Sequence, residues 1–162
     1  MKTNQTAELL LDTLRKKKYT ITFAESCTGG LMSSSFVDAS GASSAFEYGF
    51  VTYSKEAKNE TLGVSFETID NFGIVSKEVA LEMAKGAIAK SRADVAISVT
   101  GCAGPGKDDE GNEAGTVCFG FIIKDIILSE KTHINGTTRN EIRENAVEYA
   151  FQRIIYFLNN TD

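Results

Sequence analysis

Hydrophobic positions along this 162-residue chain recur with two different periods, which predict alternating helices and strands. The first clear example is the segment 5–18, where Ala7, Leu10, Leu11 and Leu14 follow the spacing of one helix face. Further helices are expected at 31–37, 55–62, 65–73, 77–91 and from 139 to about 158. Alternating or continuously apolar runs predict strands at 19–24, 48–54, 94–100, 115–124 and 125–134.

Capping residues mark where several of these helices begin and end. Ser54 precedes the predicted helix 55–62 and Gly63 follows it, and these residue types are preferred at those positions. Thr138 and Glu141 have the spacing of a capping box, which starts the last helix. Strands that alternate with helices, followed by a hairpin and a helix, predict an α/β layer fold with a mixed sheet.

Length and composition narrow the class of protein. A chain of 162 residues with 42% hydrophobic residues is most simply a single globular domain, spanning residues 1–162. Its net charge of −5 argues against nucleic acid as a partner, because nucleic-acid binders carry basic patches. No apolar run reaches the roughly 20 residues of a membrane span, and no signal peptide is recognisable. The three cysteines lack CxxC spacing, which favours reduced thiols and a cytoplasmic location.

Glycine-rich segments follow two of the predicted strands, at 25–30 and 100–106. In open α/β sheets, ligands bind beyond the carboxyl ends of the strands, so both segments are candidates for one site. The second segment begins GCAGPGKD, close to a phosphate-loop motif, but Asp108 occupies the position of the magnesium-binding hydroxyl. This argues against a nucleotide triphosphatase. It leaves a loop in which Gly101 and Gly104 allow backbone N–H groups to approach an anion or another ligand.

The stretch FAESCTGG offers three nucleophiles in succession, Ser26, Cys27 and Thr28, before a predicted helix. In the simplest interpretation Ser26 or Thr28 only caps that helix, since both residue types are common caps. The same geometry suits catalysis, because unpaired N–H groups at a helix N-terminus can stabilise an oxyanion. Strand alternation predicts that Ser26 and Cys27 point to opposite faces, so that only one of them enters a pocket. Cys27 ranks second, since a small buried cysteine is more often a core residue.

A nucleophilic serine needs a general base, and the chain has one histidine, His133, which lies in a predicted strand. A Cys/His zinc site and a Ser-His-Asp triad therefore have little support. Three candidates follow the second predicted strand: Tyr53, Lys55 and Lys58. Lys55 is expected to face solvent. A buried Lys58 near a helix N-terminus would favour its neutral amine and could deprotonate Ser26. The spacing alone favours a surface cation at Lys58 and leaves both alternatives open.

Five ordered blocks resemble the CinA C-terminal-domain family over residues 5–158: FAESCTGG, GFVTYSKEAK with LGV, VSKEVALEMAKGA, ADVAISVTGCAGP and GTV. The resemblance implies a three-layer α/β/α sandwich with a mixed sheet. The family's characterised enzymes are nicotinamide-nucleotide amidases. The resemblance thus implies hydrolysis of the carboxamide of nicotinamide mononucleotide by a stand-alone domain, with no metal or organic cofactor.

The same resemblance assigns roles to individual residues. It implies Ser26 as the nucleophile, with Lys58 as the base, assisted by Tyr53. Substrate-binding residues are expected at Thr28, Gly29, Gly30, Gly101, Gly104 and Arg139. Among them, backbone N–H groups near Gly29 and Gly30 are expected to hold the oxyanion. Arg139 and the loop 101–106 are expected to bind the phosphate.

The chain departs from the family pattern at residues 106–114, where an acidic segment replaces a Gly-rich one. This departure keeps two alternatives open: a catalytically silent, nucleotide-binding regulatory relative, and an amidase for another small amide. The family, and a hairpin edge that could pair with a second copy, also lead us to expect a homo-oligomer.

Overall fold

The computed structural model describes residues 2–161, and side chains from residue 4 onward. Its helices are α1 (Lys2–Lys17), α2 (Leu31–Val37), α3 (Lys55–Leu62), α4 (Phe66–Phe72), α5 (Lys77–Ala89) and α6 (Arg139–Asn159), with a short 3₁₀ turn, η1 (Ala42–Ser44). Its strands are β1 (Ile21–Glu25), β2 (Phe46–Val51), β3 (Val95–Gly101), β4 (Thr116–Ile123) and β5 (Ile126–His133). Every predicted helix and strand is present, and most bounds agree within a few residues.

The five strands form one mixed sheet in the order β2-β1-β3-β4-β5. Strand β1 pairs in parallel with β2 and β3, whereas β3–β4 and β4–β5 are antiparallel. The α/β prediction with a mixed sheet is therefore confirmed. Because β1, β2 and β3 run in the same direction, their carboxyl ends meet at one end of the sheet.

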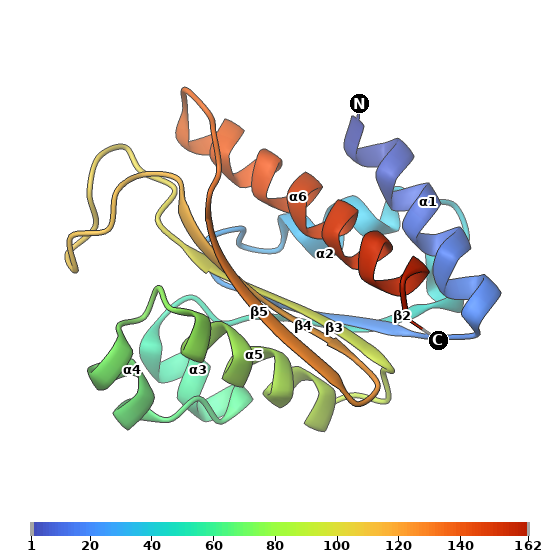
Figure 1. Cartoon of the computed structure of the whole chain (residues 1–162), viewed down its shortest axis with the longest axis horizontal. Coiled ribbons are helices and arrows are strands. Elements are labelled where there is room, and N and C mark those ends of the chain that lie inside the picture. Colours follow the sequence, from blue (N-terminus) through green and yellow to red (C-terminus); the bar gives the residue numbers. More distant parts are fainter. Residues whose placement is uncertain (1, 162) are drawn as a thin grey trace.

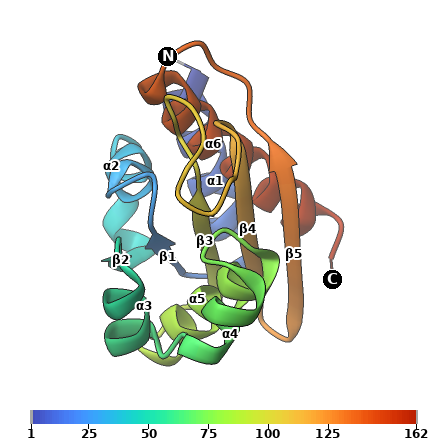
Figure 2. The same ribbon diagram turned by 90° about the vertical axis from the view of Figure 1, so that its left-hand side faces the viewer.

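Helices cover both faces of the sheet, which gives the predicted three layers. Figure 1 shows α1, α2 and α6 on one face and α3, α4 and α5 on the other. The turn after β1, the long loop after β3 and the start of α6 all lie at the left-hand end of that view. Figure 2 looks onto this end, with the loop between β3 and β4 towards the viewer.

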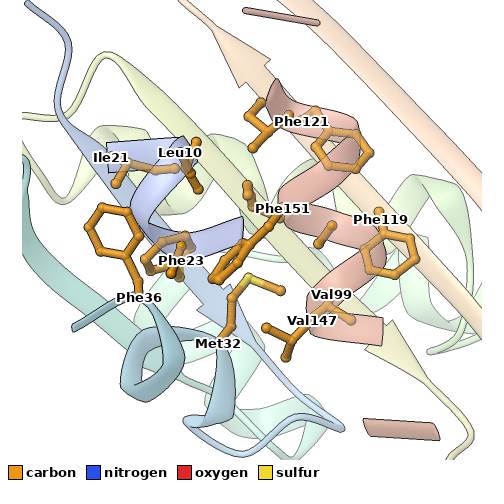
Figure 3. Packing of buried hydrophobic residues seen from close by; sticks show 14 of the residues in the cluster. Leu10, Ile21, Phe23, Met32, Phe36, Val99, Phe119, Phe121, Val147 and Phe151 are labelled. Carbon is orange, nitrogen blue, oxygen red and sulfur yellow. The ribbon is translucent and has the colours of Figure 1, made fainter. Parts of the chain in front are cut away.

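The larger core lies between the sheet and the layer of α1, α2 and α6. Phe23 is at its centre, and its ring lies within 6.0 Å of those of Phe36, Phe46 and Phe151, measured between centroids. Figure 3 shows Phe23, Phe36 and Phe151 converging from β1, α2 and α6. This packing fixes α6 and α2 relative to β1, the strand that leads into the candidate nucleophile.

The opposite face of the sheet carries small side chains, because α5 lies very close to it. The Ser98 hydroxyl donates a hydrogen bond to the Ala80 carbonyl in the middle of α5. A Cβ added at Gly120 would stand 2.6 Å from that same carbonyl oxygen. Helix α5 in turn meets α3, since a Cβ at Gly86 would lie 2.0 Å from the carbonyl oxygen of Leu62. The position of α3 is therefore set by backbone contact.

Strand β2 differs most from its prediction, since it covers Phe46–Val51 instead of 48–54. Its last predicted residues leave the sheet, and the carbonyls of Thr52 and Tyr53 turn towards the side chain of Lys58. The alternation of Val51 and Tyr53 resembles that of a strand. The carbonyls of Thr52 and Tyr53, however, accept hydrogen bonds from Lys58 instead of from a neighbouring strand, and β2 ends before them. Over the described residues, no helix combines the length and apolar character needed to cross a membrane.

Candidate functional site

A cavity of about 300 Å³ opens at the end of the sheet where the parallel strands terminate. Its walls include Ser26 from the turn after β1, Tyr53 from the segment after β2, and Arg139 from the start of α6. Residues 74–75 and 100–108 complete the lining. The two glycine-rich segments predicted to share a site thus border one cavity, at the low end of the volume range of ligand sites.

Lys58 lies beside Ser26, and its side chain is fully buried. Its Nζ is 2.8 Å from the Oγ of Ser26. It also donates to the carbonyl oxygens of Thr52 at 2.8 Å and Tyr53 at 3.0 Å. The spacing favoured a surface cation at this position, and that interpretation is wrong. Lys55, in contrast, is exposed as expected.

Local sequence explains why Lys58 reaches inward. The Ser54 side chain accepts a hydrogen bond from the Ala57 N–H at 3.0 Å and caps α3. Lys58 follows four residues later, on the face of α3 that turns towards β1. Leu62, one turn further on, is buried on the same face and packs against α5. The lysine is therefore the first inward residue of a helix whose other end is fixed by close packing.

Burial lowers the pKa of Lys58 from 10.5 to about 8, because the charged ammonium loses its hydration. A negative charge on Cys27 would oppose this shift. Burial, however, raises the pKa of the Cys27 thiol to about 12, so that thiol is neutral near pH 8. Desolvation therefore controls the Lys58 amine, and a substantial neutral fraction is present near neutral to mildly alkaline pH.

A neutral Lys58 amine can satisfy all three of its contacts. An –NH₂ group has two N–H donors, and two carbonyl oxygens, those of Thr52 and Tyr53, accept from Nζ. The lone pair is then left for the third contact, with the Oγ of Ser26 at 2.8 Å. The Ser26 hydroxyl lies 3.5 Å from the Tyr53 carbonyl oxygen, to which it donates weakly, and it can turn to donate a hydrogen bond to a neutral Nζ at the shorter distance of 2.8 Å.

Cys27 was ranked second as a nucleophile, and one argument used for that ranking is wrong. Strand alternation predicted that Ser26 and Cys27 could not both reach one pocket, yet both border the cavity. Strand β1 ends at Glu25, and the residues that follow form a turn in which alternation does not apply. Cys27 nevertheless belongs to the larger core, and its raised pKa keeps it protonated.

Tyr53 contacts Lys58 through its main-chain carbonyl, whereas its phenol is directed elsewhere. The Arg139 Nη2 donates to the Tyr53 hydroxyl at 3.0 Å, and Nη1 donates to the carbonyl of Gly104. Arg139 therefore ties the loop after β3 to the phenol across the cavity. Gly101 and Gly104 both line this cavity, as predicted for ligand-binding positions.

The predicted anion site at the start of α2 is already occupied by the protein. The Glu25 carboxylate accepts the N–H groups of Met32 at 2.7 Å and Ser33 at 3.0 Å. The Gly29 N–H donates to the Ser26 carbonyl at 3.0 Å, so this member of the N–H groups expected near Gly29 and Gly30 already has a partner within the turn. The helix dipole of α2 is therefore directed at a carboxylate and not at the Ser26 hydroxyl.

Two neighbouring positions also differ from expectation. Thr28 is fully buried, and its hydroxyl donates to Glu25 Oε1 at 2.6 Å instead of facing the cavity. Gly30 has a φ of 102° and serves as the N-cap of α2. These residues shape the turn that carries Ser26, and the structure gives neither of them a place in the cavity wall.

The sequence analysis missed two residues that hold this turn. Glu25 is one, and the only sequence signal for it is a charged residue within an otherwise apolar strand. Arg143 is the other: it donates to the carbonyls of Cys27 at 3.0 Å and Thr28 at 2.8 Å. Its position one turn after Arg139 on α6 places both arginines at the same end of the sheet.

The acidic segment 106–114 folds against the rest of the site. The Asp108 carboxylate accepts the N–H groups of Glu110 at 3.0 Å and Asn112 at 2.8 Å, which forms a compact turn. The Glu110 carboxylate accepts the Ile74 N–H at 2.9 Å and so joins the loop to the segment before α5. These acidic side chains hold the loop in place beside the cavity.

Other candidate chemistry lies elsewhere. His133, at the end of β5, borders a separate depression with residues 134–135, 145, 148–149 and 152. Among the described residues, no group of three or more His, Cys, Asp or Glu side chains is arranged to hold a metal ion. Ser26 and Lys58 are the pair in direct hydrogen-bond contact at the cavity.

This arrangement was compared with known proteins. The family model of the CinA C-terminal domain matches residues 3–158. The chain belongs to the CinA C-terminal domain family. A competence-damaged protein (CinA) superfamily protein from Klebsiella pneumoniae has the same fold, with a TM-score of 0.95 and 29% identity over 98% of this chain and 99% of that one. The family predicted from the five sequence blocks is confirmed.

Curated members of the CinA family fall into two lengths. The nicotinamide-nucleotide amidohydrolase PncC of Escherichia coli K12 is 41% identical over 159 residues, which cover 97% of this chain and 96% of that protein. The CinA-like protein of Petrotoga mobilis is 43% identical over 146 residues, but the match covers only 36% of its length. The chain thus corresponds to about a third of the longer CinA-like relatives.

Proposed function

We propose that this domain is a nicotinamide-nucleotide amidase, which converts nicotinamide mononucleotide and water into nicotinic acid mononucleotide and ammonia. The observation that carries the proposal is the 2.8 Å contact between the Nζ of Lys58 and the Oγ of Ser26 inside the cavity. The similarity to the PncC amidohydrolases over nearly their whole length supports the choice of substrate.

In this mechanism the neutral Lys58 amine removes the proton from Ser26 as Oγ attacks the carboxamide carbon. The C=O π electrons move to the oxygen and form a tetrahedral intermediate. The intermediate collapses, the C–N bond breaks, and Lys58 returns the proton to the leaving nitrogen as ammonia forms. Water, deprotonated by the same amine, then attacks the acyl ester. The C–Oγ bond breaks and Lys58 returns the proton to Oγ, which restores Ser26, while the released carboxylic acid loses its proton to the solvent.

Tyr53 and Arg139 are proposed to bind the substrate. The Tyr53 phenol accepts a hydrogen bond from Arg139, so its own O–H remains free to donate into the cavity. Two of the five N–H donors of Arg139 are used by Tyr53 and Gly104, and the others can bind a phosphate oxygen. Tyr53 thus acts on the substrate in this proposal, while its main-chain carbonyl orients Lys58.

The test is an ammonia-release assay with nicotinamide mononucleotide, nicotinamide riboside and nicotinamide as separate substrates. We expect turnover of the mononucleotide, its loss in Ser26→Ala, and only a mild effect of Cys27→Ala. Binding of the mononucleotide without turnover would instead indicate a silent regulatory relative. Turnover of an unphosphorylated amide would indicate a different substrate, and a dead Cys27→Ala variant would contradict the nucleophile assignment.

We also propose that the domain forms a homo-oligomer through the free edge of β5. This strand ends the sheet and exposes Ile126 and Ile127. An exposed apolar edge strand is a template for pairing with another strand.

A further inference from the structure

The buried carboxylate of Glu25 touches neither the cavity nor a cation in the mechanism above, yet it immediately precedes Ser26. We propose that Glu25 is a positioning residue that holds the Ser26 hydroxyl within reach of Lys58. This inference rests on the proposed function, because it assigns a part in the activation of the same nucleophile.

The side-chain hydrogen bonds of Glu25 all run to residues 28–33, in the segment that follows Ser26. Oε1 accepts from the Thr28 hydroxyl at 2.6 Å and from the Met32 N–H at 2.7 Å. Oε2 accepts from the Ser33 N–H at 3.0 Å and from the Ser33 hydroxyl at 2.7 Å. Four hydrogen bonds from one side chain thus span the turn and the first residues of α2.

Glu25 also connects this turn to the segment that orients Lys58. Its main-chain carbonyl accepts the Thr52 N–H at 2.9 Å. The carbonyl of Thr52 is one of the two that accept from the Lys58 amine. One fully buried residue therefore fixes the nucleophile through its side chain and the base through its backbone.

The other side of the turn is held by Arg143, which binds the carbonyls of Cys27 and Thr28. The turn around Ser26 is thus held by two groups: the Glu25 carboxylate at the end of β1 and the Arg143 guanidinium on α6. Together, the hydrogen bonds of Glu25 and Arg143 restrict the turn to one conformation. A displacement of about 1 Å between reacting groups can cost on the order of 10²-fold in rate.

Both oxygens of Glu25 receive backbone N–H groups, and a carboxamide cannot reproduce this pattern. In Glu25→Gln, the Nε2 donor must face either the Met32 N–H or the Ser33 N–H, which places two donors against each other. The turn must then shift to separate them. We expect a loss of kcat of about 10²-fold with KM changed less than about threefold, because the cavity wall is left in place.

A second readout does not require the natural substrate. A fluorophosphonate reacts with an activated serine, and mass spectrometry measures the rate of labelling at Ser26. Glu25→Gln should label about 10²-fold more slowly per folded molecule, with the folded fraction measured by circular dichroism. The matched control is Glu82→Gln, since Glu82 accepts the Ser65 N–H at the start of α4 and lies outside the cavity lining. It should label at the wild-type rate.

A milder variant covers the case in which Glu25→Gln does not fold. Thr28→Val keeps the side-chain shape and removes one of the four hydrogen bonds to Glu25, so labelling should slow on the order of 10-fold. Thr28→Ser, which retains the hydroxyl, should restore the wild-type rate. A role in substrate contact would instead raise KM in Thr28→Val without slowing the labelling.

The outcomes separate the two proposals. Wild-type protein that is labelled at Ser26 but releases no ammonia from nicotinamide mononucleotide would refute the proposed substrate, and the labelling rates would still decide the role of Glu25. A folded Glu25→Gln variant that labels at the wild-type rate would overturn the positioning role, as would unchanged labelling in Thr28→Val.

Discussion

The side chain of Lys58 shows how burial can convert a cation into a base. Its amine lies in a fully buried position beside the Cys27 thiol, which stays protonated and uncharged because its own pKa is raised. The lowered pKa and the 2.8 Å contact with Ser26 then have one cause, which is the inward placement of this residue on α3. In the proposed mechanism, that placement allows Lys58 to activate Ser26 without a histidine.

The pH dependence of the reaction follows from the lowered pKa. The neutral fraction of Lys58 grows as pH rises, so kcat/KM should increase with pH and level off above a pKa of about 8. Initial rates of ammonia release between pH 6.5 and 9.5 measure this profile. A rate that is flat or falls across this range would contradict the assignment of Lys58 as base.

Substitution of the base gives a second check on the same group. An arginine side chain stays protonated at these pH values, so Lys58→Arg should lower kcat by at least about 10²-fold. Lys55→Arg, at the exposed first residue of α3, is the matched control and should retain wild-type kcat. Equal losses in the two variants would point to a disturbance of α3 instead of a missing base.

Arg139 should act mainly on binding. It contacts Gly104 and the Tyr53 phenol at the mouth of the cavity, so Arg139→Ala should raise KM for the mononucleotide by about 10-fold or more and change kcat less. Arg92→Ala, at an exposed ion pair with Glu47, should leave both constants unchanged. An unaltered KM in Arg139→Ala would remove this residue from the substrate site.

Helix positions were largely predictable, because they depend on residues close in sequence. Ser54, Ser76 and Thr138 each cap the helix predicted after them, and each side chain accepts an N–H three residues later. The end of β2 was not predictable, since it depends on Lys58, which approaches from the next helix. The role of Glu25 was also missed, because its hydrogen-bond partners lie in a turn whose shape cannot be read from the spacing of residues.

Because α5 lies so close to α3, replacing a glycine of α5 with alanine should destabilise the protein instead of stabilising it. Gly to Ala within a helix normally stabilises by about 1 kcal/mol. In Gly86→Ala, however, the new Cβ would lie 2.0 Å from the Leu62 carbonyl, so unfolding free energy should fall by roughly 1–3 kcal/mol. Urea denaturation measures this change. Lys85→Ala, on the exposed face of α5, should stay within about 0.5 kcal/mol of wild type.

The arrangement of the sheet limits where a second copy can pair. Strands β2 and β5 are its two edges, and β5 exposes Ile126 and Ile127. Ile127→Lys should therefore shift an oligomer towards monomer in light scattering, because a charge is costly within an apolar strand contact. Val37→Lys, at an exposed position on α2, should leave the assembly intact. An unchanged mass in Ile127→Lys would exclude the β5 edge as the contact.

In the proposed mechanism, the two residues that exchange a proton and the groups that face the substrate come from separate parts of the chain. Ser26, in the turn after β1, and Lys58, on α3, both lie within the first 62 residues, whereas the loop 100–108 and Arg139 follow much later. In the proposed mechanism, exchanging the loop 100–108 for that of a relative would change which amides fit the cavity without moving Ser26 and Lys58. The architecture thus allows selectivity to diverge without rebuilding the chemistry.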